Sequence, residues 1–276
     1  MIKYAVAVTL YYPSEEDINK IYDYCQVFDL VFIYDNTESH ANSHLIFNNN
    51  KIIYYTTGKN NGLAIAFNKA IDVCVQNSID YLCTMDQDST FVIHEIEKIK
   101  SYIEKNHSII MSSIGAIGPF VSFDNCFRAE ERVEEKNWII TSGTFLNLSL
   151  LIKTRISFDE NYFIDRLDKD LCEQIVRSGK KIIVYMNSVL YQTLGEGNRK
   201  KNPDHSPLRH YYIFRNRLYY NKKFLTNPSK FFNNIIQSVK HILLILIFEK
   251  EKGKKIQMCK KGMSDYKQCK FGKMEQ

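Results

Sequence analysis

Two carboxylates follow a short apolar run in the first third of the chain. The run Tyr81–Met85 has the length of a buried strand, and Asp86 and Asp88 come directly after it. In an extended chain, residues i and i+2 point to the same side, so both carboxylates could face one ligand. Hard oxygen ligands of this kind hold Mg²⁺ or Mn²⁺, which takes its other ligands from water and from substrate phosphates. The alternative is a polar turn that satisfies its own backbone, since a bare D-x-D pattern is common by chance.

Polar residues also end two other predicted strands. Thr9 and Tyr11 lie at the end of Tyr4–Leu10, and Asp35 follows Leu30–Tyr34. If the strands are parallel, their carboxyl ends share one edge of the sheet, where open α/β sheets bind ligands. The three polar ends together predict a site for a nucleotide and a metal-bound diphosphate. Neither G-x-G-x-x-G nor G-x-x-x-x-G-K-[ST] occurs, so the pattern differs from dinucleotide-binding and P-loop folds.

Strand-like runs alternate with helical runs, which is typical of a mostly parallel sheet with helices on both faces. Ser14 and Asp17 have the spacing of a capping box and predict that a helix begins at Glu15. The predicted strands are Tyr4–Leu10, Leu30–Tyr34, Lys51–Tyr55, Tyr81–Met85, Gly115–Val121, Trp138–Ile140 and Lys180–Tyr185. The predicted helices are Glu15–Cys25, Leu63–Gln76, Glu95–Glu104 and Leu171–Ser178.

Acidic residues alternate with large apolar ones from Asp159 to Asp170, just before the helix predicted at Leu171–Ser178. Asp168 and Asp170 are either ordinary acids at a helix N-terminus, where the macrodipole favours them, or include a general base near the metal site. Two interpretations also remain for the turn that contains Gly143. Gly143 either lets the backbone approach a ligand or forms a simple bulge.

Arginines and tyrosines gather between His205 and Arg217. Arg209, Arg215 and Arg217 could grip a diphosphate, since a guanidinium binds phosphate through two parallel hydrogen bonds. An RNA-binding patch with stacking aromatics is the alternative, but no RNA-binding motif accompanies it.

The composition is that of an ordinary globular protein. The chain has 276 residues, 45% hydrophobic and 25% charged, which allows one large domain or two small ones. The seven cysteines include no C-x-x-C pair, so neither a zinc site nor a disulfide framework is indicated. Lys3 is followed by a strand-like run, so we expect no signal peptide and a reduced, cytoplasmic protein.

The net charge of +6 is concentrated at the C-terminal end, where nine lysines and four acids follow Phe248. The apolar run Ile242–Phe248 before them is far shorter than the roughly 20 residues that span a bilayer. An apolar helix face followed by lysines fits the surface of an anionic membrane, and the alternative is a core helix with a solvated tail. On the membrane interpretation, deleting residues after about Lys250 would reduce membrane recovery and leave donor binding unchanged.

Several motifs in order resemble family 2 glycosyltransferases with a GT-A fold, and more narrowly the bacterial rhamnosyltransferases that use dTDP-rhamnose. The resemblance covers roughly residues 4 to 220. The D-Q-D-S form and the N-x-G-x-A-x-A-x-N run are far more specific than a bare D-x-D. The motifs are Asp35-Asn36-Thr37, Gly58 to Asn68, Asp86-Gln87-Asp88-Ser89, Thr141-Ser142-Gly143, Phe163-Ile164-Asp165, and His205-Ser206-Pro207 with Arg209, Tyr211, Tyr212, Arg215 and Asn216.

The resemblance implies an α/β fold of the GT-A (Rossmann-like) type, with a mostly parallel central sheet, flanking helices and a C-terminal helical extension. Residues 1–220 would form the glycosyltransferase domain, with a nucleotide-binding half at about 1–120 and an acceptor and catalytic half at about 121–220. Residues 221–276 would form a basic, membrane-associating extension.

The resemblance also implies a role for each matching residue. Asp168 matches the catalytic base. A divalent cation, Mg²⁺ or Mn²⁺, would be held by Asp88, with Asp86 and Gln192 as further candidates. The implied nucleotide-sugar contacts are Thr9, Tyr11 and Asp35 at the base, Asn60 and Gly62 near the ribose, Asp86 on the ribose side, and Arg209 and Tyr212 in a loop over the diphosphate.

Two positions depart from the family pattern. Gln192 stands where the family often has a histidine that ligates the metal, and a neutral amide oxygen is a poorer ligand. Gln174 stands where the family has an arginine after the second acid, so we expect the base to be oriented less firmly.

The activity implied is inverting transfer of rhamnose from dTDP-rhamnose to a hydroxyl of a lipid-linked or cell-surface polysaccharide precursor. The enzyme would work at the inner face of the cell membrane, without nucleic acid as a partner. Two alternatives remain open: the same fold with a UDP-hexose or UDP-galactofuranose donor, and a non-catalytic protein that binds nucleotide sugars.

Overall fold

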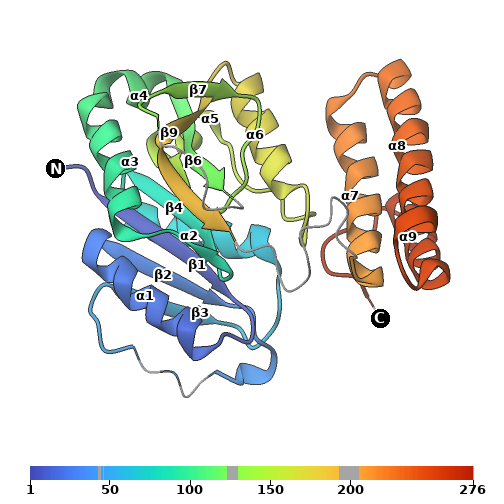
Figure 1. Ribbon diagram of the computed structural model, residues 1–276, viewed down its shortest axis with the longest axis horizontal. Helices are drawn as coiled ribbons and strands as arrows, with labels where there is room; N and C mark the ends of the chain where they lie inside the picture. Colours follow the sequence, from blue (N-terminus) through green and yellow to red (C-terminus); the bar gives the residue numbers. More distant parts are fainter. Residues whose placement is uncertain (43–44, 46, 123–129, 193–204, 276) are drawn as a thin grey trace. The chain divides into compact units, whose positions relative to one another are not determined.

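The computed structural model describes residues 1–42, 45, 47–122, 130–192 and 205–275 (Figure 1). The chain forms two compact units. The first, which we call the sheet unit, comprises Met1–Asp159 and Asp168–Gly195. The second, the helical unit, comprises Glu160–Leu167 and Glu196–Gln276.

The sheet unit is built on one mixed sheet with the strand order β3-β2-β1-β4-β8-β6-β9-β5, and β7 pairs with β9. The strands β3, β2, β1 and β4 are parallel, whereas β8 is antiparallel to both β4 and β6. The predicted α/β class with a mostly parallel central sheet is therefore confirmed, and the antiparallel pairs lie in the second half. The strands are β1 (Tyr4–Leu10), β2 (Leu30–Asp35), β3 (Ile52–Thr56), β4 (Tyr81–Asp86), β5 (Ser89–Thr90), β6 (Ile114–Ser122), β7 (Val133–Lys136), β8 (Thr144–Asn147) and β9 (Lys181–Gln192).

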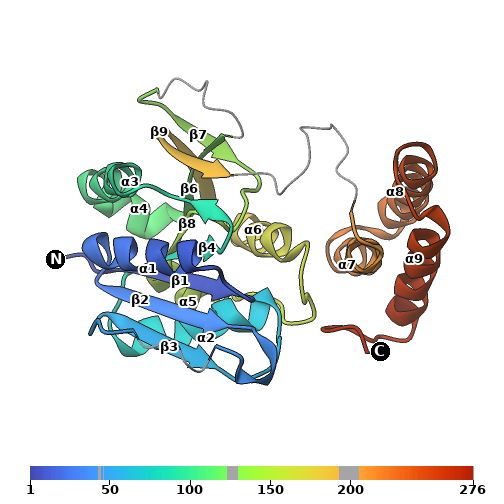
Figure 2. The same cartoon turned by 60° about the horizontal axis from the view of Figure 1, so that its bottom comes forward.

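Helices lie on both faces of this sheet, with α1 on one side of β1 and β2 and α2 on the other (Figure 2). The predicted capping box is confirmed: the Ser14 hydroxyl accepts from the backbone N–H of Asp17, and the Asp17 carboxylate accepts from the N–H of Ser14. The helical elements are α1 (Glu15–Val27), the short 3₁₀ turn η1 (Glu38–His40), α2 (Leu63–Gln76), α3 (Ile93–Lys105), α4 (His107–Ser113), α5 (Leu148–Thr154) and α6 (Leu167–Arg177).

The core follows the two-residue period of the strands. Tyr4, Val6 and Val8 of β1 join the cluster that includes Ile21 of α1 and Ile96 of α3. The alternating positions of β1 are the small residues Ala5, Ala7 and Thr9, which are also buried, and α2 contacts β1, β2 and β4. Alternation thus seals both faces of the strands whose carboxyl ends carry the polar residues.

Three predicted elements differ from the structure. Trp138–Ile140 is not a strand but part of the connection between β7 and β8. Strand β9 extends to Gln192, well beyond the predicted end at Tyr185. Helix α6 begins at Leu167 instead of Leu171, which places Asp168 and Asp170 in its first turn, where the helix macrodipole favours acids.

The helical unit contains α7 (Pro207–Phe224), α8 (Asn227–Phe248) and α9 (Lys252–Lys267) around a small core. The solvated-tail interpretation is wrong for α9, whose Cys259 and Gly262 are buried. The apolar run Ile242–Phe248 is the end of a 22-residue helix, the one helix in the described ranges long and apolar enough to cross a membrane by length and composition. Helix α7 groups with this unit, so the predicted boundary at residue 220 falls inside a helix, and the functional division of the chain stays a prediction.

Candidate functional site

The polar ends of β1, β2 and β4 meet at one edge of the sheet. Thr9 of β1 is the Cα partner of Asp86 in β4 and of Tyr34 in β2, and Leu10 pairs with Asp35. The predicted convergence of the three strand ends is therefore confirmed. The sheet register alone brings Thr9, Asp35 and Asp86 to the same edge.

Gln87, the middle residue of the D-Q-D-S motif, fixes the turn after β4. Its Oε1 accepts from the backbone N–H of Tyr11 at 2.8 Å, and its Nε2 donates to Oδ2 of Asp17 at 3.0 Å. An amide side chain can do both because it carries a donor and an acceptor. Gln87 therefore links the carboxylate turn to the residue after β1 and to the first turn of α1. Its position between two aspartates does not reveal this role.

The turn Thr141-Ser142-Gly143 wraps around the end of β4. The Thr84 hydroxyl donates to the carbonyl of Thr141 at 2.6 Å, and the Gly143 N–H donates to the carbonyl of Thr84 at 2.8 Å. The N–H of Asp86 donates to the Ser142 hydroxyl at 3.3 Å. This motif thus supports the carboxylate turn from the second half of the sheet.

Gly143 itself has a structural reason to be glycine. Its φ is +76°, and a Cβ would lie 3.0 Å from Cγ of Pro119 and 3.2 Å from Cδ2 of Leu190. Protein atoms occupy the space beside it, which favours the turn over close approach to a ligand.

Asp86, Asp88 and Asp168 form a cluster of carboxylates. Burial first, and then the charges of Asp88 and Asp168, raise the pKa of the Asp86 carboxyl to about 7. Asp86 is only half-buried as a residue, yet its Oδ1 is buried and has no hydrogen-bond partner within the described part of the chain. The Ser89 hydroxyl at the start of β5 is also buried and has no hydrogen-bond partner within the described part of the chain.

This donor set fits a divalent cation. Carboxylate oxygens are the ligands that Mg²⁺ and Mn²⁺ prefer, and a cation would offset the repulsion that raises the pKa of Asp86. Gln192, another predicted ligand, is the Cα partner of Ser89 in the β5–β9 pair, so its backbone lies beside the residue after Asp88. The predicted positions are thus adjacent in the sheet.

Asp168 and Asp170, the two predicted candidates for a general base, and Asp165, an acid of the same short run, have different surroundings. The negative charge of the Asp168 carboxylate raises the pKa of Asp86. Asp170 is fully buried and accepts from Nε2 of Gln174 at 2.6 Å, so Gln174 orients Asp170. Asp165 belongs to the helical unit, where Nη2 of Arg209 lies 3.4 Å from its Oδ1.

Asp35, the predicted base contact, is buried in a network of its own. It accepts from the Thr37 N–H at 2.8 Å, the Asn42 side-chain amide at 2.9 Å and the Tyr54 hydroxyl at 2.6 Å. A carboxylate has about four lone-pair sites, so one remains for a ligand donor. The network fixes the orientation of that remaining site.

Tyr11, Asn60 and Gly62 lie together near this end of the sheet. Partial burial, followed by the charge and hydrogen bond of Glu38, raises the pKa of the Tyr11 phenol, while a hydrogen bond with Asn60 acts in the opposite direction. Oδ1 of Asn60 accepts from the N–H of Gly62 at 3.1 Å, and Gly62, with φ +84°, is the N-cap residue of α2. The G-K-N-N-G motif therefore folds back toward Tyr11.

Arg209 and Tyr212, the predicted diphosphate loop, belong to the helical unit. Arg209 is exposed in the first turn of α7, whereas Tyr212 is buried and its hydroxyl accepts from the N–H of Met274 at 2.8 Å. Arg215 and Arg217 are 0% and 4% exposed, so the idea that they join a diphosphate grip or an RNA patch is wrong. Sequence alone did not reveal that these two arginines pack inside the unit.

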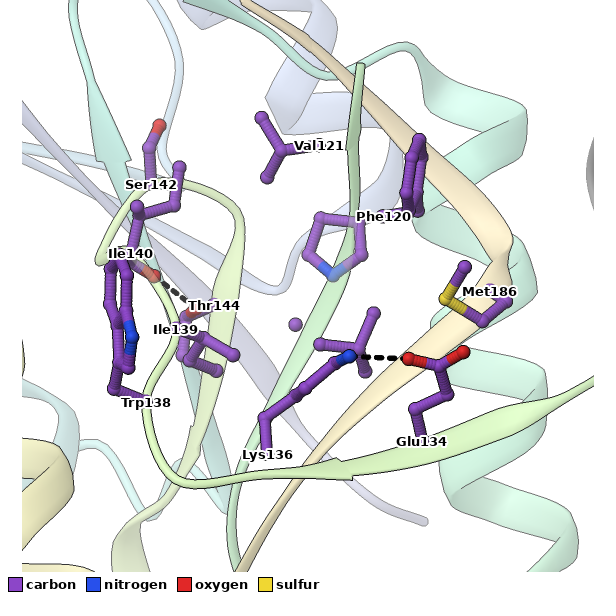
Figure 3. Close-up of a pocket in the computed structure, with 13 residues that line it drawn as sticks. Phe120, Val121, Glu134, Lys136, Trp138, Ile139, Ile140, Ser142, Thr144 and Met186 are labelled. Carbon is purple, nitrogen blue, oxygen red and sulfur yellow. Dashed lines mark hydrogen bonds and ion pairs between the residues drawn. The ribbon is translucent and has the colours of Figure 1, made fainter. Parts of the chain in front are cut away.

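A cavity of about 190 Å³ adjoins the Thr141-Ser142-Gly143 turn (Figure 3). Trp138 and Ile140 lie on one side of it, and Phe120 and Met186 on the other. Ser142, which accepts from the Asp86 N–H, lines it too. The ammonium of Lys169, the neighbour of Asp168, lies 4.5 Å from the centre of the Trp138 ring. The cavity is therefore connected by contacts to both the β4 turn and the first turn of α6.

Comparisons with known proteins match this architecture. Residues 33–158 match the family model described as glycosyl transferase family 2. The chain is 23% identical over 271 residues to the dTDP-rhamnosyl transferase RfbF of Shigella flexneri, with 90% of each chain covered.

Solved structures of similar fold include two complexes, one with a sugar nucleotide and one with a nucleotide, a sugar and a metal ion. TarS of S. aureus in complex with UDP-GlcNAc has a TM-score of 0.59 at 15% identity, with 97% of this chain and 81% of that chain covered. GalNAc-T7 with UDP, GalNAc and Mn²⁺ has a TM-score of 0.56 at 8% identity, with 78% and 47% covered. These likenesses show the fold.

Proposed function

We propose that this chain, which carries a glycosyltransferase family 2 domain on a GT-A fold, is an inverting rhamnosyltransferase that uses dTDP-rhamnose. The observation that carries the proposal is the carboxylate cluster of Asp86, Asp88 and Asp168 at the strand edge. The acceptor is a hydroxyl of a lipid-linked or cell-surface polysaccharide precursor. The similarity to RfbF supports the choice of donor.

In this proposal Asp168 takes the proton from the acceptor hydroxyl. The hydroxyl oxygen then forms a bond to the anomeric carbon while the bond from that carbon to the diphosphate oxygen breaks. The electron pair leaves with dTDP, and attack from the opposite face inverts the anomeric configuration. The charge of Asp168 raises the pKa of the Asp86 carboxyl, so Asp168 lies close to the carboxylate cluster, which supports its role as the general base.

Asp88, with Asp86 and Gln192 as further candidates, would hold a divalent cation, Mg²⁺ or Mn²⁺. When bound, the cation supplies neutralisation of the charge that develops on the leaving diphosphate. Thr9, Tyr11, Asp35, Asn60 and Gly62 would bind the nucleoside. Asp35 is suited to a pyrimidine N3–H because one acceptor site remains in its fixed network. Arg209, which is exposed, keeps its proposed role over the diphosphate, whereas Tyr212 is buried and its hydroxyl is bonded to Met274.

The experiment is a donor screen with the purified full chain. We expect release of dTDP from dTDP-rhamnose that depends on Mg²⁺ or Mn²⁺ and stops in EDTA. Asp88→Ala should lower turnover at least 100-fold with an unchanged melting temperature, because Asp88 is exposed at a turn. Release of UDP from a UDP-hexose or UDP-galactofuranose instead would favour the alternative donors. Donor binding without any turnover would favour the non-catalytic alternative.

A second part of the proposal concerns where the enzyme works. The chain would act in the cytoplasm at the inner face of the cell membrane, where a lipid-linked acceptor is found. Fractionation of cells that express the full chain tests this, and recovery wholly in the soluble fraction would contradict it.

A further inference from the structure

Helix α8 exposes its apolar face to solvent and turns its polar face toward the rest of the helical unit. A helix of a soluble domain normally turns its apolar stripe to the core and its polar side chains to solvent. On α8, nine large apolar side chains are 44–63% exposed: Phe231, Phe232, Ile235, Ile236, Val239, Leu243, Leu246, Ile247 and Phe248.

The inner face of α8 is polar over most of its length. Asn221 donates to Asn234 at 2.8 Å, Arg217 donates to Ser238 at 3.1 Å, and a hydrogen bond of 2.9 Å joins Nδ1 of His210 to Nε2 of His241. Apolar contacts appear toward its C-terminal end, where Ile242 and Ile245 pack with Phe214 of α7. These polar bonds fix which face of α8 points outward.

The apolar stripe forms a single surface. Its side chains recur at steps of three and four from Phe232 to Leu246, which places them in one row on the helix. Part of the row lines a groove that Lys240 lines as well. Contiguous exposed apolar surface of this kind marks a binding surface.

Charge indicates the kind of partner. The 22 residues of α8 include no acid, whereas Lys230 and Lys240 lie on it and Lys250 follows it. Two copies of this stripe placed face to face would bring lysines toward lysines. An anionic lipid headgroup instead complements them, and each lysine near such a surface contributes attraction.

We propose that the outer face of α8 binds the surface of an anionic lipid bilayer, with the helix lying in the interface. Apolar side chains on one face and basic residues at the border are the features of interfacial helices. The polar bonds to α7 favour a helix lying on the membrane over one crossing it alone, because those side chains would otherwise face hydrocarbon. The membrane contact that the sequence suggested for the apolar run Ile242–Phe248 and the lysines after it is thus assigned to the outer face of the whole of α8.

The proposal deepens the proposed function by assigning the membrane contact to one face of one helix. It rests on that function only for its purpose, which is to bring the enzyme to a lipid-linked acceptor. None of the α8 residues belongs to the proposed donor site. Vesicle binding and donor turnover are therefore separate measurements.

The test is sedimentation of the full chain with vesicles of phosphatidylcholine, with and without phosphatidylglycerol. The variant Ile236→Ser/Val239→Ser/Leu243→Ser changes three exposed side chains of the stripe. The matched control, Ile109→Ser/Ile152→Ser, changes exposed isoleucines of α4 and α5 in the sheet unit. We expect the wild type to sediment with anionic vesicles, the stripe variant to lose about tenfold in partitioning, and the control to stay within about twofold.

Lys240→Gln/Lys250→Gln should reduce the preference for anionic over neutral vesicles. Melting temperatures of all variants establish that they are folded. Wild type that stays in the supernatant with anionic vesicles overturns the proposal. A wild-type dimer in analytical ultracentrifugation that the stripe variant converts to a monomer, without vesicle binding, also overturns it and identifies a second copy as the occupant. Vesicle binding without turnover of any donor would contradict the proposed function and leave this proposal intact.

Discussion

Asp168 is the proposed general base, and Asp168→Asn should separate chemistry from binding. The change is nearly isosteric and removes the ability to take a proton. General base catalysis contributes about 10²- to 10⁴-fold, so turnover should fall by at least 100-fold. Donor affinity, measured by calorimetry, should stay within a few fold because Asp35 and Asp88 are unchanged.

Asp170→Asn and Asp165→Asn are the matched controls. Asp170 is buried and bonded to Gln174, so its variant should lose stability rather than chemistry. Near-normal turnover of the Asp168 variant together with a large loss in the Asp165 variant would move the base to Asp165. A parallel loss of donor affinity in the Asp168 variant would make Asp168 a donor contact and leave the mechanism without a base.

Asp86 gives a prediction about stability and pH. Its folded pKa of about 7 lies above the unfolded value of 3.8, so its ionisation costs stability as pH rises from about 4 to 7. In EDTA at pH 8, Asp86→Asn should therefore raise the free energy of unfolding by up to about 4 kcal/mol, since the two pKa values differ by about 3 and one pKa unit corresponds to about 1.4 kcal/mol. The gain should shrink toward pH 4, where the wild-type carboxyl is protonated in both states.

Urea denaturation at pH 8 and pH 5 measures this effect, with Asp72→Asn, an exposed aspartate of α2 outside the carboxylate cluster, as the control. The same gain at both pH values, or a loss at pH 8, would show that the ionised Asp86 carboxylate does not destabilise the folded state.

Two glycines of α9 form a matched pair at the level of the helix. A Cβ on Gly262 would lie 2.7 Å from the backbone carbonyl oxygen of Tyr211 in α7, whereas a Cβ on Gly253 would meet nothing within 4 Å. Gly262→Ala should therefore force the helices apart and cost about 1–3 kcal/mol. Gly253→Ala should be neutral or stabilise by up to about 1 kcal/mol, because alanine favours a helix.

Thermal unfolding followed by circular dichroism compares the two variants. A Gly262 variant as stable as the Gly253 variant would mean that α7 and α9 do not pack closely at this crossing.

Elements with local signals were the most predictable. The bounds of α2 match the prediction, and the capping box begins α1 where Ser14 and Asp17 indicated. Trp138–Ile140 was mistaken for a strand because an apolar run can also line a cavity. The edge that collects Thr9, Asp35 and Asp86 was predictable because parallel strands share one carboxyl end. The burial of Arg215 and Arg217 was not, since it depends on how three helices pack.

The fold of the helical unit changes what a C-terminal truncation should do. The sequence suggested that residues after about Lys250 could be removed without harm to donor binding. In the structure, the Tyr211 hydroxyl donates to Asp265 at 2.8 Å, and Nη2 of the buried Arg215 donates to the carbonyl of Gly272 at 2.8 Å. Residues after Lys250 therefore accept hydrogen bonds from two buried side chains of α7.

Truncation after Lys250 should unfold the helical unit. It removes α9 and leaves the Arg215 guanidinium without part of its acceptors, and breaking a buried charged contact costs about 3–5 kcal/mol. That is a large share of the 5–15 kcal/mol that stabilises a typical domain. Limited proteolysis should cut within α7 of the truncated chain, and hydrogen exchange there should lose its protection. Truncation after Cys269, which removes Gly272 but keeps α9, should give a smaller loss, and truncation after Met274 should change neither measurement. If the chain truncated after Lys250 resists proteolysis as well as the full chain does, α9 is dispensable and the sequence expectation stands.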